Sequence, residues 1–307
     1  MLEIIKPGTN FDFIGFRRIA YAISLAMIVG SLVAVALRGL NYGIDFAGGT
    51  TVHVRFRDPV EIGRVREAIG KAAIRDITVQ DFGGARNEFL VRVPEADPEL
   101  KKGLAENVEK ALREEFGSEG AYQVLRVESV GPRVGKDLRR RAILAVLAST
   151  VMMGIYITLR FELRFGIGAA AALFHDVIIT VGALSLFAYE FDLNTVAALL
   201  TVVGFSVNDT VIVSDRIREN LRKSRREALP LVMNRSINET LSRTVLTNGT
   251  ALFVVIALFL LGGDIIHGFA FALLVGFTVG TYSSIFVVVP IVLGMERRGA
   301  LTKARAA

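Results

Sequence analysis

Ionisable and polar side chains inside otherwise apolar segments are the residues of this sequence best placed to do chemistry. A charged side chain at the centre of a bilayer costs about 2.5–3.5 kcal/mol on insertion scales, so each one requires a structural or a functional reason. The candidates are Asp176, Asp209 and Arg243, together with Asn208 and Thr210, which are the polar neighbours of Asp209. The chemistry that such groups support inside a membrane is the binding and release of protons.

Asp209 allows two interpretations. In the first it is structural, either paired with Arg243, which opens the fifth apolar segment at an expected similar depth, or protonated and hydrogen-bonded between helices. In the second it carries protons, because removal from water favours the neutral carboxyl whereas a nearby guanidinium favours the carboxylate. A helix shift that makes or breaks the contact with Arg243 would then switch Asp209 between binding and releasing a proton. One charge crossing roughly 100 mV gains about 2.3 kcal/mol, enough to drive such a switch.

The dipeptide His175-Asp176 lies near the middle of the third apolar segment. A structural role is the first interpretation of this pair, and a second proton site is the alternative. The pair also resembles the metal-binding His-Asp dipeptide of phosphohydrolases. No nearby residue completes a ligand set, and the chain has three His, so we expect no metal.

The rest of the sequence offers no sign of enzymatic chemistry. It has no Cys, which excludes thiolate metal sites and redox chemistry. No Walker A pattern or glycine-rich phosphate loop follows a predicted strand, so ATP is not the expected energy source. No Ser/His/Asp or paired-carboxylate arrangement indicates hydrolysis. We therefore expect a protein that is not an enzyme and binds no cofactor, with protons as the coupling ion.

Six apolar segments position these residues. Each has about 20 residues with few charges, the length that crosses the hydrocarbon of a bilayer as a helix. The segments are Ile19–Leu37, Ala142–Leu159, Phe165–Tyr189, Leu193–Val213, Thr244–Leu261 and Ile266–Leu293. The first lacks an Ala-x-Ala-like cleavage site, which favours a retained helix over a signal peptide. The sequence predicts a polytopic α-helical membrane protein with six transmembrane helices.

The net charge of +6 is concentrated beside these segments. The basic positions are Arg17, Arg18, Arg160, Arg164, the run Arg216–Arg226 and the tail 296–305. Cytoplasmic N- and C-termini place all of them in the cytoplasm, as the positive-inside rule requires. The exception, Arg139–Arg141, follows a long translocated segment, where the rule is weak. The run Arg216–Arg226 is expected to set topology, with docking of anionic membrane lipid or a partner as the alternative. No surplus charge indicates a nucleic-acid partner.

The segment between the first two apolar stretches predicts a folded domain outside the membrane. Its strand-like stretches are Gly49–Phe56, Asp76–Phe82, Asn87–Val93 and Tyr122–Val130, and its helical stretches are Val60–Ala73 and Pro98–Phe116. Residues 83–86 carry a hairpin-loop signal. The order βαββαβ predicts an α+β ferredoxin-like fold. We expect the N-terminus and first helix in residues 1–40, the domain in 41–135, helices two to six in 136–294 and a basic cytoplasmic tail in 295–307.

Four motifs resemble the SecD/SecF family of protein-export membrane proteins, in the resistance-nodulation-division superfamily. Asn41–Thr50 (NYGIDFAGGT) resembles the signature shared by SecD and SecF. The stretches Phe174–Thr180, Val203–Asn220 and Ser242–Asn248 are similar to the SecF branch. We assign no specific role to Asp45 or to Gly48-Gly49, where a tight bend is the simpler expectation. Gly276-x-x-x-Gly280 is expected to serve helix packing.

The resemblance implies an auxiliary subunit of protein export in the bacterial inner membrane, with residues 41–135 in the periplasm. Members pair with SecD, associate with the SecYEG channel and use the proton-motive force to draw preproteins outward late in translocation. The motifs imply proton conduction at Asp209 and Arg243, with Asn208 and Thr210 shaping the path. Asp176 stays a further candidate proton site because of its place within the third apolar segment. The chain has one set of spans, so a separate SecD partner is expected. Two rival hypotheses remain: a passive scaffold for SecD or the channel, and half of a proton-coupled small-molecule exporter, which would carry a larger outer domain.

Overall fold

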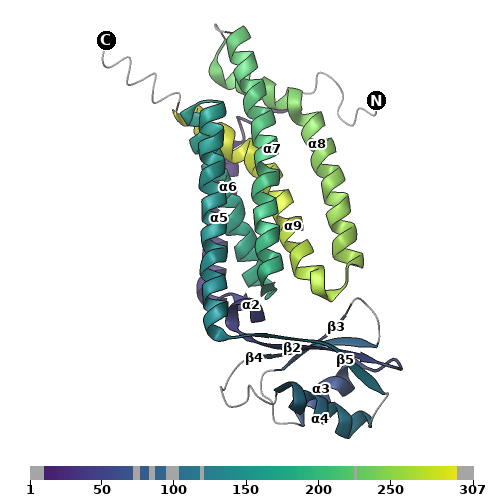
Figure 1. Cartoon of the computed structure of the whole chain (residues 1–307). Helices are drawn as coiled ribbons and strands as arrows, with labels where there is room; N and C mark the ends of the chain where they lie inside the picture. Colours follow the sequence, from purple (N-terminus) through teal and green to yellow (C-terminus); the bar gives the residue numbers. More distant parts are fainter. Residues whose placement is uncertain are drawn as a thin grey trace.

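Long helices form a bundle with a small α/β domain at one end (Figure 1). This computed structural model describes residues 10–71, 77–82, 87–94, 104–117, 121–224 and 227–295. Among these residues, six helical segments are long and apolar enough to cross a membrane. They are α1 (Arg17–Arg38), α5 (Pro132–Arg160), α6 (Leu163–Leu186), α7 (Leu193–Lys223), α8 (Leu229–Leu261) and α9 (Asp264–Ser283) with its π-helical continuation η2 (Ser284–Val288). The predicted six transmembrane helices are confirmed.

Several helices extend beyond the apolar segments. α5 begins at Pro132, where proline suits the first turn of a helix, and α8 begins at Leu229, well before Thr244. α7 starts at the expected Leu193, because Asp192 caps it by accepting a hydrogen bond from the backbone N–H of Thr195 at 2.8 Å. Apolarity thus indicates the membrane-embedded part of a helix, whereas capping and proline determine where the helix begins.

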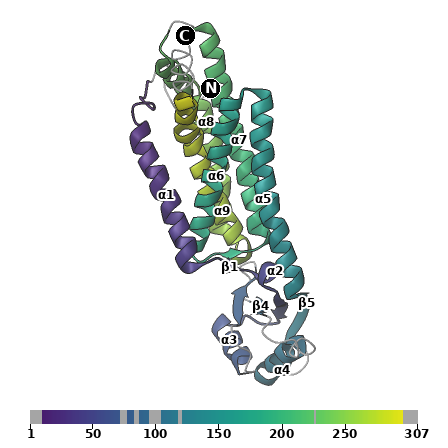
Figure 2. The ribbon, with the colours of Figure 1, turned by 90° about the vertical axis from the view of Figure 1, so that its left-hand side faces the viewer.

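Small residues allow the helices of the bundle to approach closely. Gly276 of α9 packs on Val202 of α7, and a Cβ added at Gly280 would lie 3.1 Å from the Cβ of Ser206. The motif Gly276-x-x-x-Gly280 therefore serves packing, as expected. Figure 2 shows α1 along one side of the bundle, where it packs on α6. α1 begins, and η2 ends, at the end of the bundle away from the domain, which we name the distal end.

The α/β domain has the predicted ferredoxin-like fold. Its elements are β2 (Gly49–Phe56), α3 (Ile62–Gly70), β3 (Thr78–Asp81), β4 (Glu88–Pro94), α4 (Leu104–Phe116) and β5 (Tyr122–Val130). The strands form one antiparallel sheet in the order β3-β4-β2-β5. Alternate apolar side chains of the strands face α3 and α4, with Val52, Val54, Phe89 and Val91 fully buried. The expected hairpin loop at 83–86, the beginning of the second helix and the basic tail lie outside the described residues.

The sheet lies between the bundle and the two helices α3 and α4 (Figure 1). Its second face, which carries polar side chains, therefore faces the bundle. The register places His53 and Arg55 of β2 on this open face. The orientation brings charged residues of the sheet close to the loops that join the membrane helices.

The chain enters and leaves the domain at one place. β1 (Asn41–Tyr42) pairs in parallel with β6 (Glu190–Phe191), and the short helix α2 (Ile44–Ala47) follows β1. Gly48 has φ +84°, and a Cβ there would lie 3.0 Å from the Cα of Pro132, so the chain makes the expected tight bend. Since α5 begins at Pro132, the boundary expected at residue 135 lies in its first turn. Two-residue strands leave no periodic signal, and the β1–β6 pairing could not be predicted.

Candidate functional site

Asp209 lies in the middle of α7, where three helices meet. Its side chain is 1% exposed, and its Oδ2 accepts a hydrogen bond from Nδ2 of Asn248 on α8. The same amide donates to Oγ1 of Thr281 on α9 at 2.8 Å. The other carboxylate oxygen, Oδ1, has no hydrogen-bond partner within the described chain. Asp209 is therefore a buried carboxyl group with one donor and one free acceptor position.

The two polar neighbours of Asp209 differ in orientation. Thr210 is buried at 2% exposure, whereas Asn208 lies on the exposed side of α7. Successive residues of an α-helix point about 100° apart, so neighbours in sequence need not share a face. The structure thus keeps Thr210 within the bundle beside Asp209 and places Asn208 on the bundle surface.

Arg243 does not reach Asp209. It lies five residues before Asn248, which is about 7.5 Å along α8 toward the distal end. It lines a distal cavity of about 430 Å³ together with Arg160, Asp215 and other residues. No ion pair joins Arg243 to Asp209 in the described chain, so the structural ion pair considered from the sequence is absent here. A guanidinium near the end of the bundle stays close to water, whereas one at the centre of the bilayer would lose its hydration.

Asp176 occupies a second junction and has more partners. Its side chain is fully buried, and its Oδ2 accepts hydrogen bonds from Ser206 Oγ of α7 at 2.7 Å and Ser283 Oγ of α9 at 2.8 Å. Its Oδ1 lies 2.9 Å from Nδ1 of His175. Ser283 directly precedes the π-helical turn η2, and such turns are frequent at functional sites. Three helices thus converge on Asp176 through polar contacts.

Sequence reasoning missed the polar partners around both carboxylates. Asn248 donates to Asp209 and also to Thr281, whereas Ser206 and Ser283 donate to Asp176. Each is a small polar residue inside an apolar segment, which is the available signal, because such residues often hydrogen-bond across membrane helices. Among the described residues, no group of three His, Asp or Glu side chains has a metal-site arrangement.

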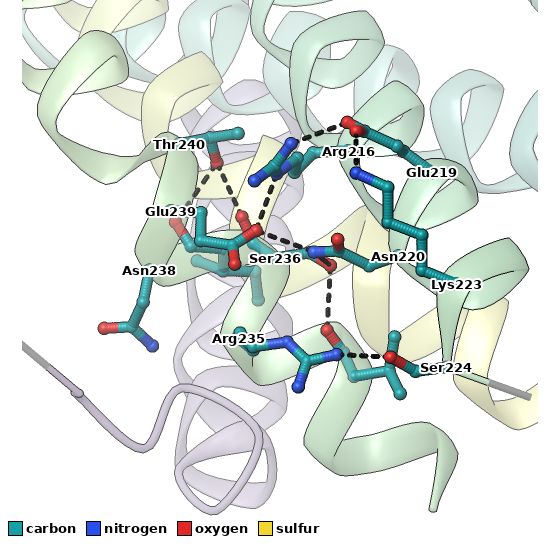
Figure 3. A network of polar contacts seen from close by, with 12 residues as sticks. Arg216, Glu219, Asn220, Lys223, Ser224, Arg235, Ser236, Asn238, Glu239 and Thr240 are labelled. Carbon is teal, nitrogen blue, oxygen red and sulfur yellow. Dashed lines mark hydrogen bonds and ion pairs between the residues drawn. The ribbon is translucent and has the colours of Figure 1, made fainter. Parts of the chain in front are cut away.

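A polar network joins the distal ends of α7 and α8 (Figure 3). Arg216 donates to Glu219 and to Glu239, each at 2.6 Å, and Asn220 donates to Glu239 at 2.6 Å and to Ser236 at 3.0 Å. Part of the basic run expected at Arg216–Arg226 is therefore paired with carboxylates. The network fixes the distal end of α7 to α8.

Comparison with known proteins identifies the family. Residues 108–298 match the model described as protein export membrane protein SecD/SecF, C-terminal, and residues 33–60 match the SecD/SecF GG motif. The chain is 48% identical to the protein translocase subunit SecF of Magnetococcus marinus, over 96% of this chain and 95% of that one. It is 45% identical to the SecF of Vibrio alginolyticus, over 94% of this chain and 90% of that one.

A solved structure gives the same result. The crystal structure of SecDF from Thermus thermophilus, described as a translocon-associated membrane protein, superposes with a TM-score of 0.79 at 39% identity. The match covers 94% of this chain and 39% of the SecDF chain, so this chain spans well under half of that longer protein. With six membrane-spanning helices, this is a multi-pass membrane protein. The chain belongs to the SecD/SecF family of protein-export membrane proteins.

Proposed function

We propose that this chain is an accessory subunit of the Sec protein-export machinery that uses the proton-motive force to promote late preprotein translocation. Its relatives are protein translocase subunits, and the matched SecDF is translocon-associated. The part of SecDF that this chain does not cover points to SecD as its partner. The SecYEG channel and the translocating preprotein are the further partners of this proposal.

Charge distribution supports an orientation in the bacterial inner membrane. The distal end of the bundle carries the basic residues Arg160, Arg164 and Arg216, and positive residues favour the cytoplasmic side. Both termini are then cytoplasmic, and the α/β domain is periplasmic. In this orientation a proton driven inward passes from the domain side of the bundle toward the distal cavity.

The observation that carries the proposal is the incomplete hydrogen bonding of Asp209. A carboxyl group with a free oxygen can gain or lose a proton without breaking a full set of contacts. Its partner Asn248 also binds Thr281, so a change in the charge of Asp209 alters a contact that joins α7, α8 and α9. Arg243, about one and a half turns toward the distal end, is the positive group we assign to the exit side. Thr210 and Asp176 would lie beside this path, and Asn208 would face lipid or SecD.

The test is preprotein translocation into inverted inner-membrane vesicles, with ATP supplied and the proton-motive force imposed or collapsed. Asp209→Asn keeps the shape of the side chain and removes its titration. The control is Asp137→Asn, which removes an exposed carboxylate of α5 that does not line the distal cavity. Copurification with SecD is checked for both variants.

We expect Asp209→Asn to copurify with SecD and to lose the translocation gained from the proton-motive force, while Asp137→Asn retains that gain. If Asp209→Asn assembles and retains the full gain, the carboxylate is structural and the subunit is a scaffold.

A further inference from the structure

Arg92 extends from the middle of the sheet toward the membrane bundle. It lies on β4, opposite Thr51 of β2 and Thr78 of β3, so strands on both sides hold its backbone in place. Its side chain is only 17% exposed and forms an ion pair with Glu190 of β6. This ion pair joins the α/β domain to the segment that connects α6 and α7.

Two more carboxylates lie beside Arg92, both at the first turn of α7. Asp192 Oδ1 accepts hydrogen bonds from the backbone N–H and the hydroxyl of Thr195, each at 2.8 Å. Asp45 Oδ2 accepts one from the backbone N–H of Leu193 at 3.1 Å. Carboxylates are favourable at this end of a helix, where backbone N–H groups lack partners. The acidic side of the contact is therefore fixed to the start of α7.

Burial and the neighbouring carboxylates act on the charge of Arg92 in opposite directions. Burial lowers the pKa of Arg92, whereas the charges of Asp192 and Asp45 raise it. An arginine remains charged in proteins, so the positive charge persists at physiological pH. Without it, Asp45, Glu190 and Asp192 would be three carboxylates with mutual repulsion, and Glu190 would lose its ion pair with the sheet.

The space around Arg92 is open. Cavities of about 260 and 420 Å³ lie between the sheet and the bundle, and both are lined by Arg92 and Asp192. Arg92 thus bridges a gap instead of filling a packed core. These cavities leave space beside the bridge, so we expect that loss of the bridge would leave the tilt of the domain poorly defined.

The helix at the other side of the bridge carries the candidate proton site. α7 is continuous from Leu193 to Lys223, and Asp209 lies about 24 Å from its start. The distal end of the same helix is held to α8 by the network around Arg216 (Figure 3). A rigid helix held in this way transmits a displacement of one end to the residues along its length.

We propose that Arg92 is a positioning residue for transport: its ion pair with Glu190, beside Asp192 and Asp45, couples the position of the α/β domain to α7 and thereby to Asp209. This inference rests on the proposed function. It also gives Asp45, in the motif near the first membrane helix, a role as acceptor for the start of α7.

The first experiment measures the position of the domain directly. The chain has no Cys, so Lys110→Cys on α4 and Leu261→Cys at the end of α8 provide two unique sites for spin labels. Distance distributions between the labels are recorded for the full chain in membranes. The variants are Arg92→Gln, Arg92→Lys, which retains the charge, and the control Arg126→Gln. Arg126 lines the cavity of about 260 Å³ together with Arg92. Its ion pair is with Glu128 of the same strand, β5, so it does not join the domain to the bundle.

We expect a narrow distribution for the parent and for Arg126→Gln, a broadened one for Arg92→Gln, and partial narrowing for Arg92→Lys. The same variants are then tested for translocation into inverted vesicles. Arg92→Gln should lose most of the gain from the proton-motive force while retaining ATP-driven translocation, and Arg92→Lys should recover part of that gain.

Two results would overturn the inference. A distribution unchanged in Arg92→Gln means that Arg92 does not position the domain. A broadened distribution with the full proton-driven gain means that the domain position is not coupled to transport. Failure of the proposed function gives a different result, because Asp209→Asn would then retain the full translocation gain from the proton-motive force.

Discussion

The two buried carboxylates of the bundle differ in how completely their hydrogen-bonding capacity is used. Asp176 contacts His175, Ser206 and Ser283, so both of its oxygens have partners. Asp209 has one donor, Asn248, and its second oxygen has none within the described chain. Asp176 joins α6 to α7 and α9, and Asp209 joins α7 to α8 and, through Asn248, to α9. The first carboxylate is fully hydrogen-bonded and the second is not.

The difference indicates a division of roles. A buried polar group with all its partners present holds its neighbours in a fixed arrangement, because moving any of them leaves an unpaired group at a cost of about 1–3 kcal/mol. A group with a free acceptor position has less to lose when its charge changes. We therefore interpret Asp176 as the residue that holds the helices of the bundle together, and Asp209 as the residue that gains and loses a proton.

Replacement of the two carboxylates by alanine should separate these roles most clearly. Asp176→Ala leaves the hydroxyl of Ser206 and the ring of His175 without their acceptor, and Ser283 keeps only the carbonyl oxygen of Gly280 at 3.2 Å. It should lower the free energy of unfolding by about 3 kcal/mol. Asp209→Ala should lower it by about 1 kcal/mol, because Asn248 retains Thr281. Unfolding of the purified chain in bicelles, monitored by steric trapping, measures the loss of unfolding free energy in each variant. Equal losses of unfolding free energy in the two variants would contradict the structural role assigned to Asp176.

The close approach of α9 to α7, on which both carboxylates depend, can be tested at a glycine. A Cβ at Gly276 would overlap Val202, whereas a Cβ at Gly204 meets nothing within 4 Å. Gly276→Ala should therefore cost about 2 kcal/mol through overpacking. Gly204→Ala should be neutral or slightly stabilising. The same unfolding measurement applies, and a harmless Gly276→Ala would show that the helices can separate without loss.

The smallest effect concerns a carboxylate outside the membrane, Glu88 of the domain. Partial burial raises the pKa of Glu88, but hydrogen bonds from Arg55 and His53 lower it by more, so its pKa lies below the ordinary value of 4.5. A carboxyl whose pKa is lowered by folding stabilises the fold above its unfolded pKa and loses this contribution as the pH falls through the folded pKa. Arg55 is half exposed, so the contribution is about 0.5 kcal/mol.

Hydrogen exchange of the β2 and β4 amides, corrected for the intrinsic pH dependence of exchange, measures this effect. Protection should decline below pH 4.5 in the parent and decline less in Glu88→Gln. The same decline in both proteins would assign the acid sensitivity to other groups.

Much of the fold follows from local patterns in the sequence. Alternation along Gly49–Phe56 indicates a half-buried strand, and apolar runs indicate the membrane helices. The membrane carboxylates stand out for the same reason, because a charge in an apolar run is costly wherever the helices lie. These signals depend on a residue and its near neighbours.

Features that depend on helix pairing could not be predicted. The position of Arg243 along α8 is given by the sequence, but its depth relative to Asp209 depends on how α7 and α8 are offset. Asn248, the actual partner of Asp209, lies 39 residues away in sequence. Arg92 likewise resembles any surface arginine on a strand until the sheet is placed over the start of α7.

The adjacency of Gly48 and Pro132 bears on how this protein could have evolved. Because the chain leaves the bundle and returns to it at nearly the same point, the domain occupies the place of a short loop. Insertions at such a point disturb the rest of a fold little. The domain could therefore be lengthened, shortened or exchanged for another while the membrane helices retain their packing.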